Sequence, residues 1–423
     1  MTKQILHAHN YGHQNIGDDA MAENVYMKLA AIEDAKVTTI STYSPPHQSG
    51  SDIRSLSGIV NNYSYFIMKI FLVGVHRLKL ARVYLVYSWF TCEFCLLIAK
   101  IYKAIGLMLL PFGSMKELIL RISSADVYLR SGSGSLNDIW FWRSMYPQFT
   151  EARLCNLFGV KVYFTGQGLG PFNGAYREKV LEKFLASCEM ITFRDCMRSE
   201  ELVAEVTPNL RNYKTVGDDA FDYPKELLDD DTQSLFDDGS KVLVCQFRPT
   251  NYEEILSDEY WKSVATILES FVDTNRKNKV VLVSFSNGRV SDLTVSKKIN
   301  EYAKNKLIVL DLVYSPGQAK TILAQAYIAI GQSYHFGVFA LAEAVPFIAL
   351  YTNRYYEDKH KGLLGWYAME KYAIPKEGIE ILKFKLEEMT NEIEILKNRI
   401  REKNVSIAKN VNTIYSLIEN NLN

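Results

Sequence analysis

The chain has 423 residues, of which 48% are hydrophobic and 23% are charged, and its 48 basic side chains balance 48 acidic ones. This length is enough for two or three domains with sizeable cores, and the composition is that of a globular protein. The neutral balance excludes the strongly basic signature of nucleic-acid-binding proteins, so no nucleic-acid partner is expected.

A short strand is predicted over residues 4–8, and the polar, glycine-containing segment after it leads into a helix predicted over residues 20–31. Because the free amides of a helix start favour an anion, Asn15 and Gly17 are candidates for a loop that binds a phosphate or an acceptor. Asp18 is either a helix cap or a catalytic carboxylate. A second strand is predicted over residues 37–40.

Residues 66–121 are rich in Leu, Ile, Tyr and Phe, and they carry eight basic residues against two acidic ones. No uncharged run reaches the roughly 18 residues that a membrane-spanning helix needs. One interpretation is a set of core helices with solvated basic faces. The other is a helical segment that lies on an anionic membrane surface. The basic residues are Lys69, Arg77, Lys79, Arg82, Lys100, Lys103, Lys116 and Arg121.

The six cysteines are scattered, and several lie in apolar runs, which predicts reduced, buried thiols in a cytoplasmic protein. Cys92 and Cys95 have the spacing of a redox or metal pair, but no second cysteine pair and no nearby histidine accompanies them. No metal site is therefore predicted. The N-terminal residues lack the charged-then-apolar layout of a signal peptide.

Two more predicted strands, over residues 126–129 and 162–165, run into glycine-rich loops. Backbone amides of such loops cradle phosphates, which makes Gly134, Ser135, Gln167 and Gly168 candidate binding residues; the alternative is that the loops only turn the chain. A further strand, over residues 191–193, ends at Arg194, which either binds an anion or forms a surface ion pair.

An acidic cluster over residues 227–238 predicts a solvated linker. After it, strands predicted over residues 242–247, 280–285 and 307–310 alternate with helices over residues 260–272 and 317–325. Two such alternating sets predict an α/β fold of two Rossmann-like domains, residues 1–225 and 226–423, that face a cleft. Arg248 follows the strand over residues 242–247 and is expected at that cleft.

The most informative stretch runs from residue 327 to residue 350: an apolar strand, a polar turn with His335, a helix, Pro346, and another strand. His335 stands where a strand ends and a helix begins, which is the edge at which open α/β sheets bind ligands. The imidazole is a candidate for acid–base catalysis or phosphate contact. The alternative is that it only caps the helix or packs locally.

The tail from Ile379 onward repeats apolar residues with the 3,4 spacing of a heptad seam. Because the run is short for a coiled coil, a terminal helix packed on its own domain is the favoured interpretation. A homodimer zipper is the alternative.

Taken together, these motifs resemble the polysaccharide pyruvyl transferase family. The similar pieces follow the family's order along most of the chain: residues 15–20, residues 132–136 with Asp138, residues 166–171, Arg194 and Asp195 with Ser199, residues 218–220, and residues 335–346. The resemblance implies a two-domain fold like that of the GT-B glycosyltransferases, with the acceptor on the N-terminal side and the donor on the C-terminal side. It also implies transfer of pyruvate from phosphoenolpyruvate to a sugar, usually as a ketal on two hydroxyls, without a cofactor.

By the same resemblance, the family's histidine corresponds to His335, and Arg194 is assigned to binding of the donor anion. Arg248, at a strand end facing the same cleft, is assigned likewise. The family often has an arginine two residues before the histidine, where this chain has Ser333; Lys359 or Lys361 is the candidate replacement for that donor-binding cation.

The expected acceptor is a sugar of a cell-surface polysaccharide or its lipid-linked oligosaccharide precursor, and the expected location is the cytoplasm or the inner face of the membrane. Two other functions stay open. A nucleotide-sugar glycosyltransferase would use the same cleft for a diphosphate, and a non-catalytic member of a polysaccharide assembly complex would bind no donor.

Overall fold

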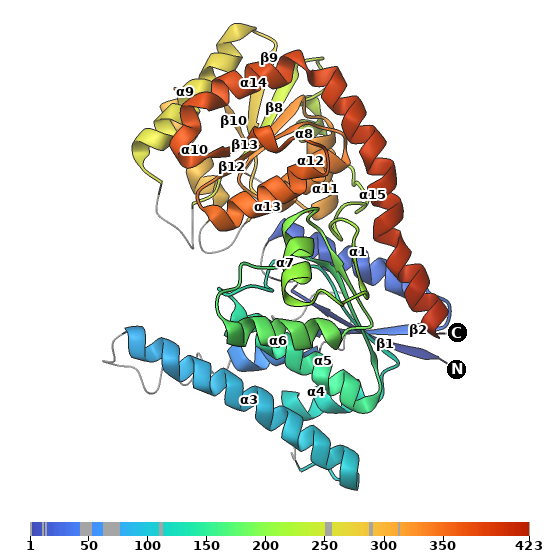
Figure 1. Ribbon diagram of the computed structural model, residues 1–423. Coiled ribbons are helices and arrows are strands. Elements are labelled where there is room, and N and C mark those ends of the chain that lie inside the picture. Colours follow the sequence, from blue (N-terminus) through green and yellow to red (C-terminus); the bar gives the residue numbers. More distant parts are fainter. Residues whose placement is uncertain are drawn as a thin grey trace.

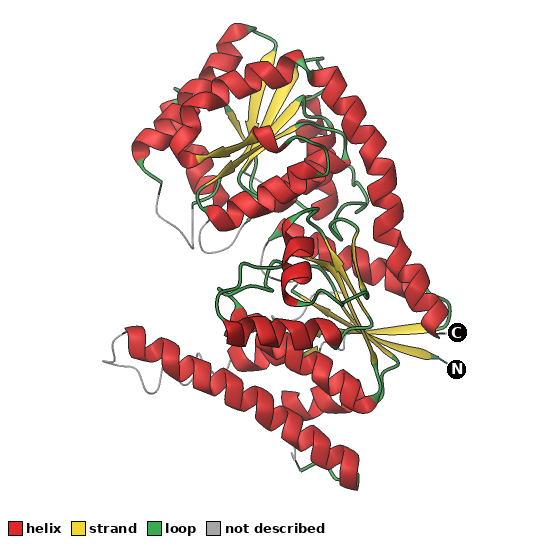
Figure 2. Ribbon diagram, in the orientation of Figure 1, coloured by secondary structure: helices red, strands yellow, loops and turns green. Residues whose placement is uncertain are grey.

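In the computed structural model the described residues are 2–10, 12, 15–42, 53–61, 77–109, 113–249, 256–286, 291–311 and 314–422, and the side chains of residues 77–84 are outside the description. The chain forms two parallel sheets, each covered by helices on both faces (Figures 1 and 2). We call residues 1–225 the N-terminal half and residues 226–423 the C-terminal half. The exact boundary between them stays a prediction.

The N-terminal sheet has the strand order β3-β2-β1-β4-β5-β6-β7, and every neighbouring pair is parallel. Its strands are β1 (Lys3–His9), β2 (Ala35–Ser41), β3 (Ile53–Arg54), β4 (Val127–Arg130), β5 (Lys161–Gln167), β6 (Met190–Phe193) and β7 (Tyr213–Thr215). Its helices are α1 (Ile16–Ala30), α3 (Arg77–Ile105), α4 (Ser114–Ser123), the π-helical turn η1 (Phe141–Met145), α5 (Tyr146–Phe158), α6 (Ala175–Ala186) and α7 (Arg198–Val206).

The C-terminal sheet has the order β10-β9-β8-β11-β12-β13, also parallel throughout. Its strands are β8 (Lys241–Gln246), β9 (Asn278–Leu282), β10 (Ile308–Val309), β11 (Ile328–Gly331), β12 (Phe347–Tyr351) and β13 (Ala373–Pro375). Its helices are α8 (Asp230–Ser234), α9 (Asp258–Thr274), α10 (Asp292–Tyr302), α11 (Pro316–Ala324), α12 (Tyr334–Ala342), α13 (Arg354–Gly365), the 3-10 turns η2 (Glu370–Tyr372) and η3 (Lys376–Ile381), α14 (Leu382–Asn391) and α15 (Ile393–Leu422).

Both sheets reverse their winding direction at one place, between β1 and β4 in the first and between β8 and β11 in the second. In doubly wound sheets, ligands bind outside the carboxyl ends of the strands at such a switch point. The loops that follow these four strands contain the candidate residues from Asn15 to Gly17, Gly134 and Ser135, Arg248, and Ser333. The topology therefore gathers them at two edges that can face each other.

The predicted α/β class and the two Rossmann-like domains are confirmed, and the strands and helices expected from the sequence are all present within a few residues. The strands read as continuous apolar runs because parallel sheets are buried on both faces. In β11, for example, all four residues are buried.

The tail was predicted to pack on its own domain, and this is confirmed for its first part, since Leu382, Leu396 and Ile400 lie in the core of the C-terminal half. The contact of its last turns with the other half was not predicted. Helix α15 runs from the C-terminal half back to the N-terminal half, where Ile414, Tyr415 and Ile418 pack with Ile5 and Val25 (Figure 1). An apolar 3,4 repeat predicts that one side of a helix is buried, but it does not predict which surface covers that side. A helix that packs on both halves therefore shows the same repeat.

The acidic segment was predicted to be a solvated loop, and it instead contains a short helix. The carboxylate of Asp229 caps α8 by accepting a hydrogen bond from the Thr232 backbone N–H at 2.8 Å. Aspartates at a helix start stabilise it as caps, a role that acidic composition alone does not reveal.

The basic, apolar segment forms α3 and α4, while residues 66–76, with Lys69, and residues 110–112 lie outside the described part. Among the described residues, one stretch is long and apolar enough to cross a membrane, Leu85–Ile105 in α3, of which 39% is buried. Cys92 and Cys95 lie on the buried side of α3, and burial raises the pKa of both thiols, for Cys95 to about 12.

Candidate functional site

The site begins where the starts of two helices from different halves meet. Asn15 caps α1: its side-chain oxygen accepts from the Gly17 N–H at 3.2 Å, and its amide donates to Asp18 Oδ2 at 3.0 Å. The Ile16 N–H donates across the halves to the Phe285 carbonyl at 3.2 Å. A Cβ added at Gly17 would lie 2.0 Å from Cγ of His335, so this glycine makes room for the histidine.

His335 lies in the first turn of α12 and is 6% exposed. Its Nε2 is 3.4 Å from Nη1 of Arg194 and 3.7 Å from Oδ2 of Asp218. Burial lowers the pKa of His335 well below its ordinary value, and the charges of Arg194, Lys359 and Arg248 lower it further. Both effects favour the neutral imidazole.

Arg194 follows β6 and is 3% exposed. Nη1 donates to Asp218 Oδ2 at 3.1 Å, and the guanidinium stacks over the Tyr334 ring at 4.2 Å from its centroid. The Trp366 indole donates to the Arg194 backbone carbonyl at 2.9 Å, which fixes the backbone beneath the side chain. Arg194 is thus a buried arginine with one edge held by a carboxylate, not a surface ion pair.

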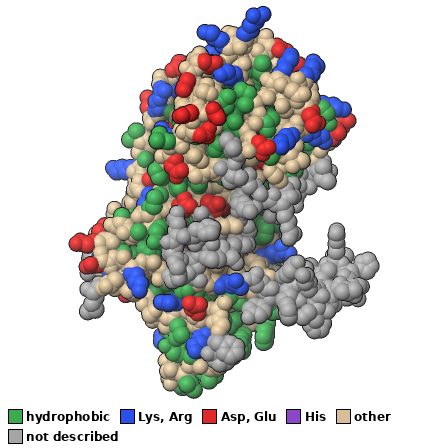
Figure 3. Space-filling view, turned by 180° about the vertical axis from the view of Figure 1, so that it is seen from behind, with side chains coloured by type: hydrophobic (Ala, Val, Ile, Leu, Met, Phe, Trp, Pro, Cys, Tyr) green, Lys and Arg blue, Asp and Glu red, His purple; other side chains and the backbone are tan. Residues whose placement is uncertain are grey.

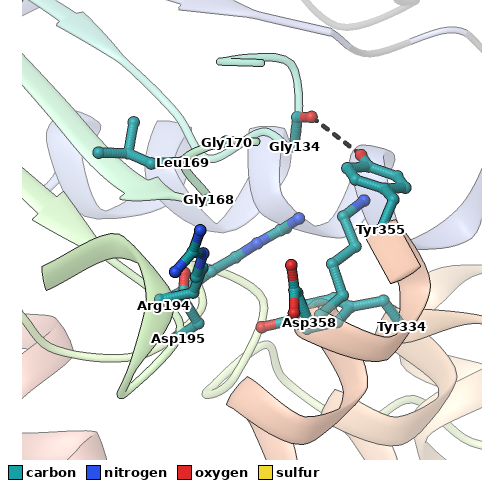
Figure 4. A pocket seen from close by; sticks show the side chains of 11 residues that line it. Gly134, Gly168, Leu169, Gly170, Arg194, Asp195, Tyr334, Tyr355 and Asp358 are labelled. Atoms are coloured by element: carbon teal, nitrogen blue, oxygen red, sulfur yellow. Dashed lines mark hydrogen bonds between the residues drawn. The ribbon is translucent and has the colours of Figure 1, made fainter. Parts of the chain in front are cut away.

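Lys359, from α13, reaches the glycine loop that follows β4. A Cβ at Gly134 would lie 2.8 Å from the Lys359 ammonium nitrogen and 2.9 Å from Arg194 Nη2. Figure 4 shows the Tyr355 hydroxyl directed at the Gly134 carbonyl, a hydrogen bond of 3.1 Å that ties α13 to this loop. The Lys359 ammonium lies 4.2 Å from the centroid of the Tyr355 ring.

Desolvation lowers the pKa of Lys359 well below its ordinary value, and the positive charges of Arg194 and Arg248 lower it further. Burial also raises the pKa of Asp18 to about 6, although the same three cations pull it down. Three basic side chains thus share one desolvated region with the carboxylates of Asp18 and Asp218. Cations gathered in this way favour a bound anion.

Arg248 and Ser333 stand at the ends of the neighbouring strands β8 and β11. The Ser333 N–H donates to Gln246 Oε1 at 2.7 Å, and the Arg248 N–H donates to Gln332 Oε1 at 2.8 Å. Within the described part of the chain, the buried Nε of Arg248 has no hydrogen-bond partner. Ser333 precedes α12 but its side chain does not cap the helix, and it is 2% exposed.

Two of the predicted loop side chains are used inside the protein. Gln167 donates to the carbonyls of Ser131 and Thr165 at 3.0 and 2.8 Å, and its oxygen accepts from the Ser133 hydroxyl. Ser135 bonds to the Ser133 hydroxyl at 2.7 Å. These contacts hold the two glycine loops against each other, while Gly168 lies beside Arg194, at 3.3 Å from a built Cβ to Nε.

Lys361 was one of two candidate replacements for the missing arginine, and it is not at the site. Its ammonium pairs with Glu357 at 2.5 Å on the outer side of α13, with 44% of its side chain exposed. Since residues 359 and 361 lie two apart on one helix, they point to different sides, and only Lys359 faces the cleft.

Sequence reasoning left three important residues out of the site. Asp218 belongs to a recognised motif, but nothing in the sequence pairs it with Arg194. Tyr334 and Tyr355 supply the rings that flank the two cations, and tyrosine is too common here, with 26 copies, to single them out.

A pocket opens beside Arg194 (Figure 4). Its open volume is about 370 Å³, including solvent at its mouth. The lining comes from both halves and consists of Gly134, Gly168, Leu169, Gly170, Arg194, Asp195, Arg198, Tyr334, Tyr355, Asp358 and Lys359. Arg194 and Lys359 therefore connect the buried histidine with a space that solvent reaches.

Comparison with known proteins adds a family and a fold. The family model described as polysaccharide pyruvyl transferase matches residues 15–354. A search among curated proteins gives no match.

Several solved structures share the architecture at low identity. The UDP complex of MnaA from S. aureus is 9% identical, with a TM-score of 0.57 over 95% of this chain and 91% of the other. The UDP-GlcNAc 2-epimerase of Neisseria meningitidis, bound to UDP-GlcNAc, is 9% identical with a TM-score of 0.57, over 99% of each chain. A UGT transferase from Siraitia grosvenorii in complex with UDP is 11% identical with a TM-score of 0.55, over 98% and 99%. At such identities the likeness shows the fold alone, which is the GT-B arrangement expected.

Proposed function

The chain belongs to the polysaccharide pyruvyl transferase family, and we propose that it transfers a pyruvyl group from phosphoenolpyruvate to a sugar of a cell-surface polysaccharide or its lipid-linked precursor. The observation that carries this proposal is the convergence of Arg194 and Lys359, from opposite halves, on Gly134 beside the buried His335. Phosphoenolpyruvate carries a carboxylate and a phosphate, and both need cations in a desolvated site.

In this proposal the donor binds where Gly134 leaves space between Arg194 Nη2 and the Lys359 ammonium. Arg194 presents the free edge of its fork to one anionic group, because its other edge is held by Asp218. Lys359 supplies the cation that the family often places at the position of Ser333. Arg248, whose Nε lacks a partner among the described residues, contributes from the end of β8.

His335 gains its proton when the donor binds. Burial lowers the His335 pKa most and the three cations lower it further, so a multiply charged anion bound among the cations offsets their part and raises the His335 pKa. The imidazolium then lies beside Asp218, which stabilises its charge. It can donate a proton to the enol methylene or to the leaving phosphate.

The bond changes balance without a cofactor. The methylene carbon of the donor takes a proton, and an acceptor hydroxyl oxygen bonds to the central carbon while its own proton passes to a base. The carbon–oxygen bond to phosphate then breaks, phosphate leaves, and the second hydroxyl closes the ketal as its proton is removed. Asp18, whose pKa is about 6, is our candidate for the base.

The test measures release of inorganic phosphate from phosphoenolpyruvate with a panel of sugar acceptors, for the wild type, Lys359→Met and Lys361→Met. We expect the Lys359 change to weaken donor binding about tenfold to a hundredfold, in line with loss of a charged hydrogen bond. The Lys361 change removes only an exposed ion pair and should behave like the wild type. Equal effects of the two variants would remove Lys359 from the donor site.

Two other outcomes select the alternatives. The GT-B fold and the UDP bound in two of the similar structures favour a nucleotide-sugar glycosyltransferase as the second candidate. Tight binding of a nucleotide sugar, without turnover of phosphoenolpyruvate, would support it. Absence of binding of either donor by calorimetry would support a non-catalytic partner in polysaccharide assembly.

A further inference from the structure

One side of helix α3 exposes a row of large apolar side chains, which we call the apolar face of α3. Their exposed fractions run from 36% for Phe94 to 67% for Val86, and together they leave on the order of 500 Å² of apolar surface in solvent. No described element packs on this face. Its members are Val86, Trp89, Phe90, Phe94, Leu97 and Ile105.

The opposite side of the same helix is fixed to the N-terminal half. Cys92, Cys95 and Ala99 are fully buried in its core. The Ser88 hydroxyl donates to the Trp142 carbonyl at 2.5 Å. A helix held in this way cannot cross a bilayer without leaving its own domain, so its apolar side is available only for contact along its length.

The charges around the apolar face are basic. Lys100 and Lys103 are exposed on α3 beside it, although the Lys103 ammonium also donates to the Leu157 carbonyl. The first turns of the helix carry Arg77, Lys79 and Arg82 in the sequence. The acid nearest to the face, Glu93, is already paired with Arg153. In Figure 3, apolar side chains stand together with basic and a few acidic ones at the lower end of the molecule, to which α3 extends in Figure 1.

From this arrangement we propose that the apolar face of α3 docks on an anionic membrane surface, with the helix lying in the plane of the lipid headgroups. Aromatic and aliphatic side chains enter the boundary between headgroups and acyl chains, and the flanking lysines meet lipid phosphates. From Val86 to Ile105 the apolar face offers a contact about 30 Å long. This proposal does not depend on the donor chemistry.

A second copy of the chain is a poorer partner for this face. Basic residues stand at both ends of α3 in the sequence, so pairing two such helices in either direction brings like charges together. An anionic lipid surface instead attracts the basic residues of both ends.

The test is co-sedimentation of the full chain with vesicles of phosphatidylcholine alone or mixed equally with phosphatidylglycerol. We expect binding to the mixed vesicles at about 50 mM salt and its loss near 500 mM. The variant Val86→Ser/Phe90→Ser/Leu97→Ser should bind at least about tenfold more weakly. The matched control Leu227→Ser/Ile395→Ser/Val405→Ser removes three apolar side chains elsewhere that are 63–91% exposed, and it should bind like the wild type.

A second measurement locates the contact. Brominated lipids quench tryptophan fluorescence only at close range, and Trp89 is the exposed tryptophan of the apolar face, so we expect quenching that Trp89→Phe largely abolishes. Failure to sediment with the mixed vesicles at low salt would overturn the proposal. Equal binding by the apolar-face variant and its control would overturn it too. A face variant that dissociates a dimer but keeps its lipid binding would assign the face to a second copy instead.

Discussion

The two halves of the molecule bring different parts to the site, and each makes room for the other. The N-terminal half offers two glycines where side chains of the C-terminal half approach: Gly17 receives His335, and Gly134 receives Lys359. In the opposite direction, Gly362 of α13 receives Asp195, whose Cβ would lie 2.8 Å from a built Cβ. Close packing of this kind couples catalytic geometry to the way in which the halves sit together.

The two halves also differ in the charged side chains that they bring to the site. The N-terminal half holds the buried carboxylates Asp18 and Asp218 and one cation, Arg194, whereas the C-terminal half supplies His335, Lys359 and Arg248. Neither half alone has both a proton donor and a complete set of anion-binding groups. A site of this kind forms only when the halves are held together, which is what α15 and the contact from Ile16 to Phe285 do.

Removal of the N-terminal cation should have the largest effect. Arg194→Gln leaves Asp218 buried without its partner and takes away one side of the donor site. We expect the free energy of unfolding to fall by about 3–5 kcal/mol and phosphate release to fall by about a thousandfold. Urea denaturation and the phosphate-release assay measure the two effects.

The matched control is Arg198→Gln, because the Arg198 side chain is 35% exposed and its ion pair is with Glu201 on its own helix. It should change the unfolding free energy by less than about 1 kcal/mol. A stability loss at residue 198 as large as that at residue 194 would show that the buried pair is not what distinguishes them.

Filling the space that one half leaves for the other should have a smaller but specific effect. The Cβ of Gly17→Ala would lie 2.0 Å from Cγ of His335, so the imidazole must move or the halves must part. Displacing a catalytic group typically lowers the reaction rate about a hundredfold. The overpacking should also lower the free energy of unfolding by about 1–3 kcal/mol.

Gly168→Ala provides the graded comparison, since its Cβ would lie 3.3 Å from Nε of Arg194, a contact that a small shift relieves. We expect a loss of less than about tenfold in phosphate release. If the two alanine variants lose activity equally, the close approach of His335 to Gly17 is not required for the reaction.

The fold could be predicted from the sequence because its signals are local. Buried parallel strands read as short apolar runs, and glycine loops at strand ends mark the edge where ligands bind, so His335 and Arg194 were placed at one cleft. The choice between Lys359 and Lys361 could not be made, because it depends on which side of α13 faces the other half.

Other features of the site could not be predicted from the sequence for similar reasons. The pairing of Arg194 with Asp218 joins residues 24 positions apart through the ends of two strands, and no spacing rule connects them. Gln167 and Ser135 were predicted to bind a phosphate, but their side chains hold neighbouring loops together. A polar residue in a glycine loop looks the same in the sequence whether it serves a ligand or the loop itself.

The smallest expected effect concerns Asp219 and the way in which the free energy of unfolding depends on pH. Its Oδ2 accepts from the Gly132 N–H at 2.7 Å and from the Thr165 hydroxyl at 2.6 Å, and burial raises its pKa to about 7. The folded protein thus keeps a proton that the unfolded chain releases near pH 4, so this stabilisation is complete below pH 4 and is lost as the pH rises to 7.

Asp219→Asn keeps an oxygen acceptor and does not titrate. Relative to this variant, the wild type should lose up to about 1.4 kcal/mol per pH unit between pH 5 and pH 7 in urea denaturation. Taking the difference cancels the opposite contribution of His335, whose lowered pKa removes stability as the pH falls below 6.5. Parallel pH curves for the two proteins would mean that Asp219 is ionised in the fold and that the carboxylates of the N-terminal half are not kept protonated by burial.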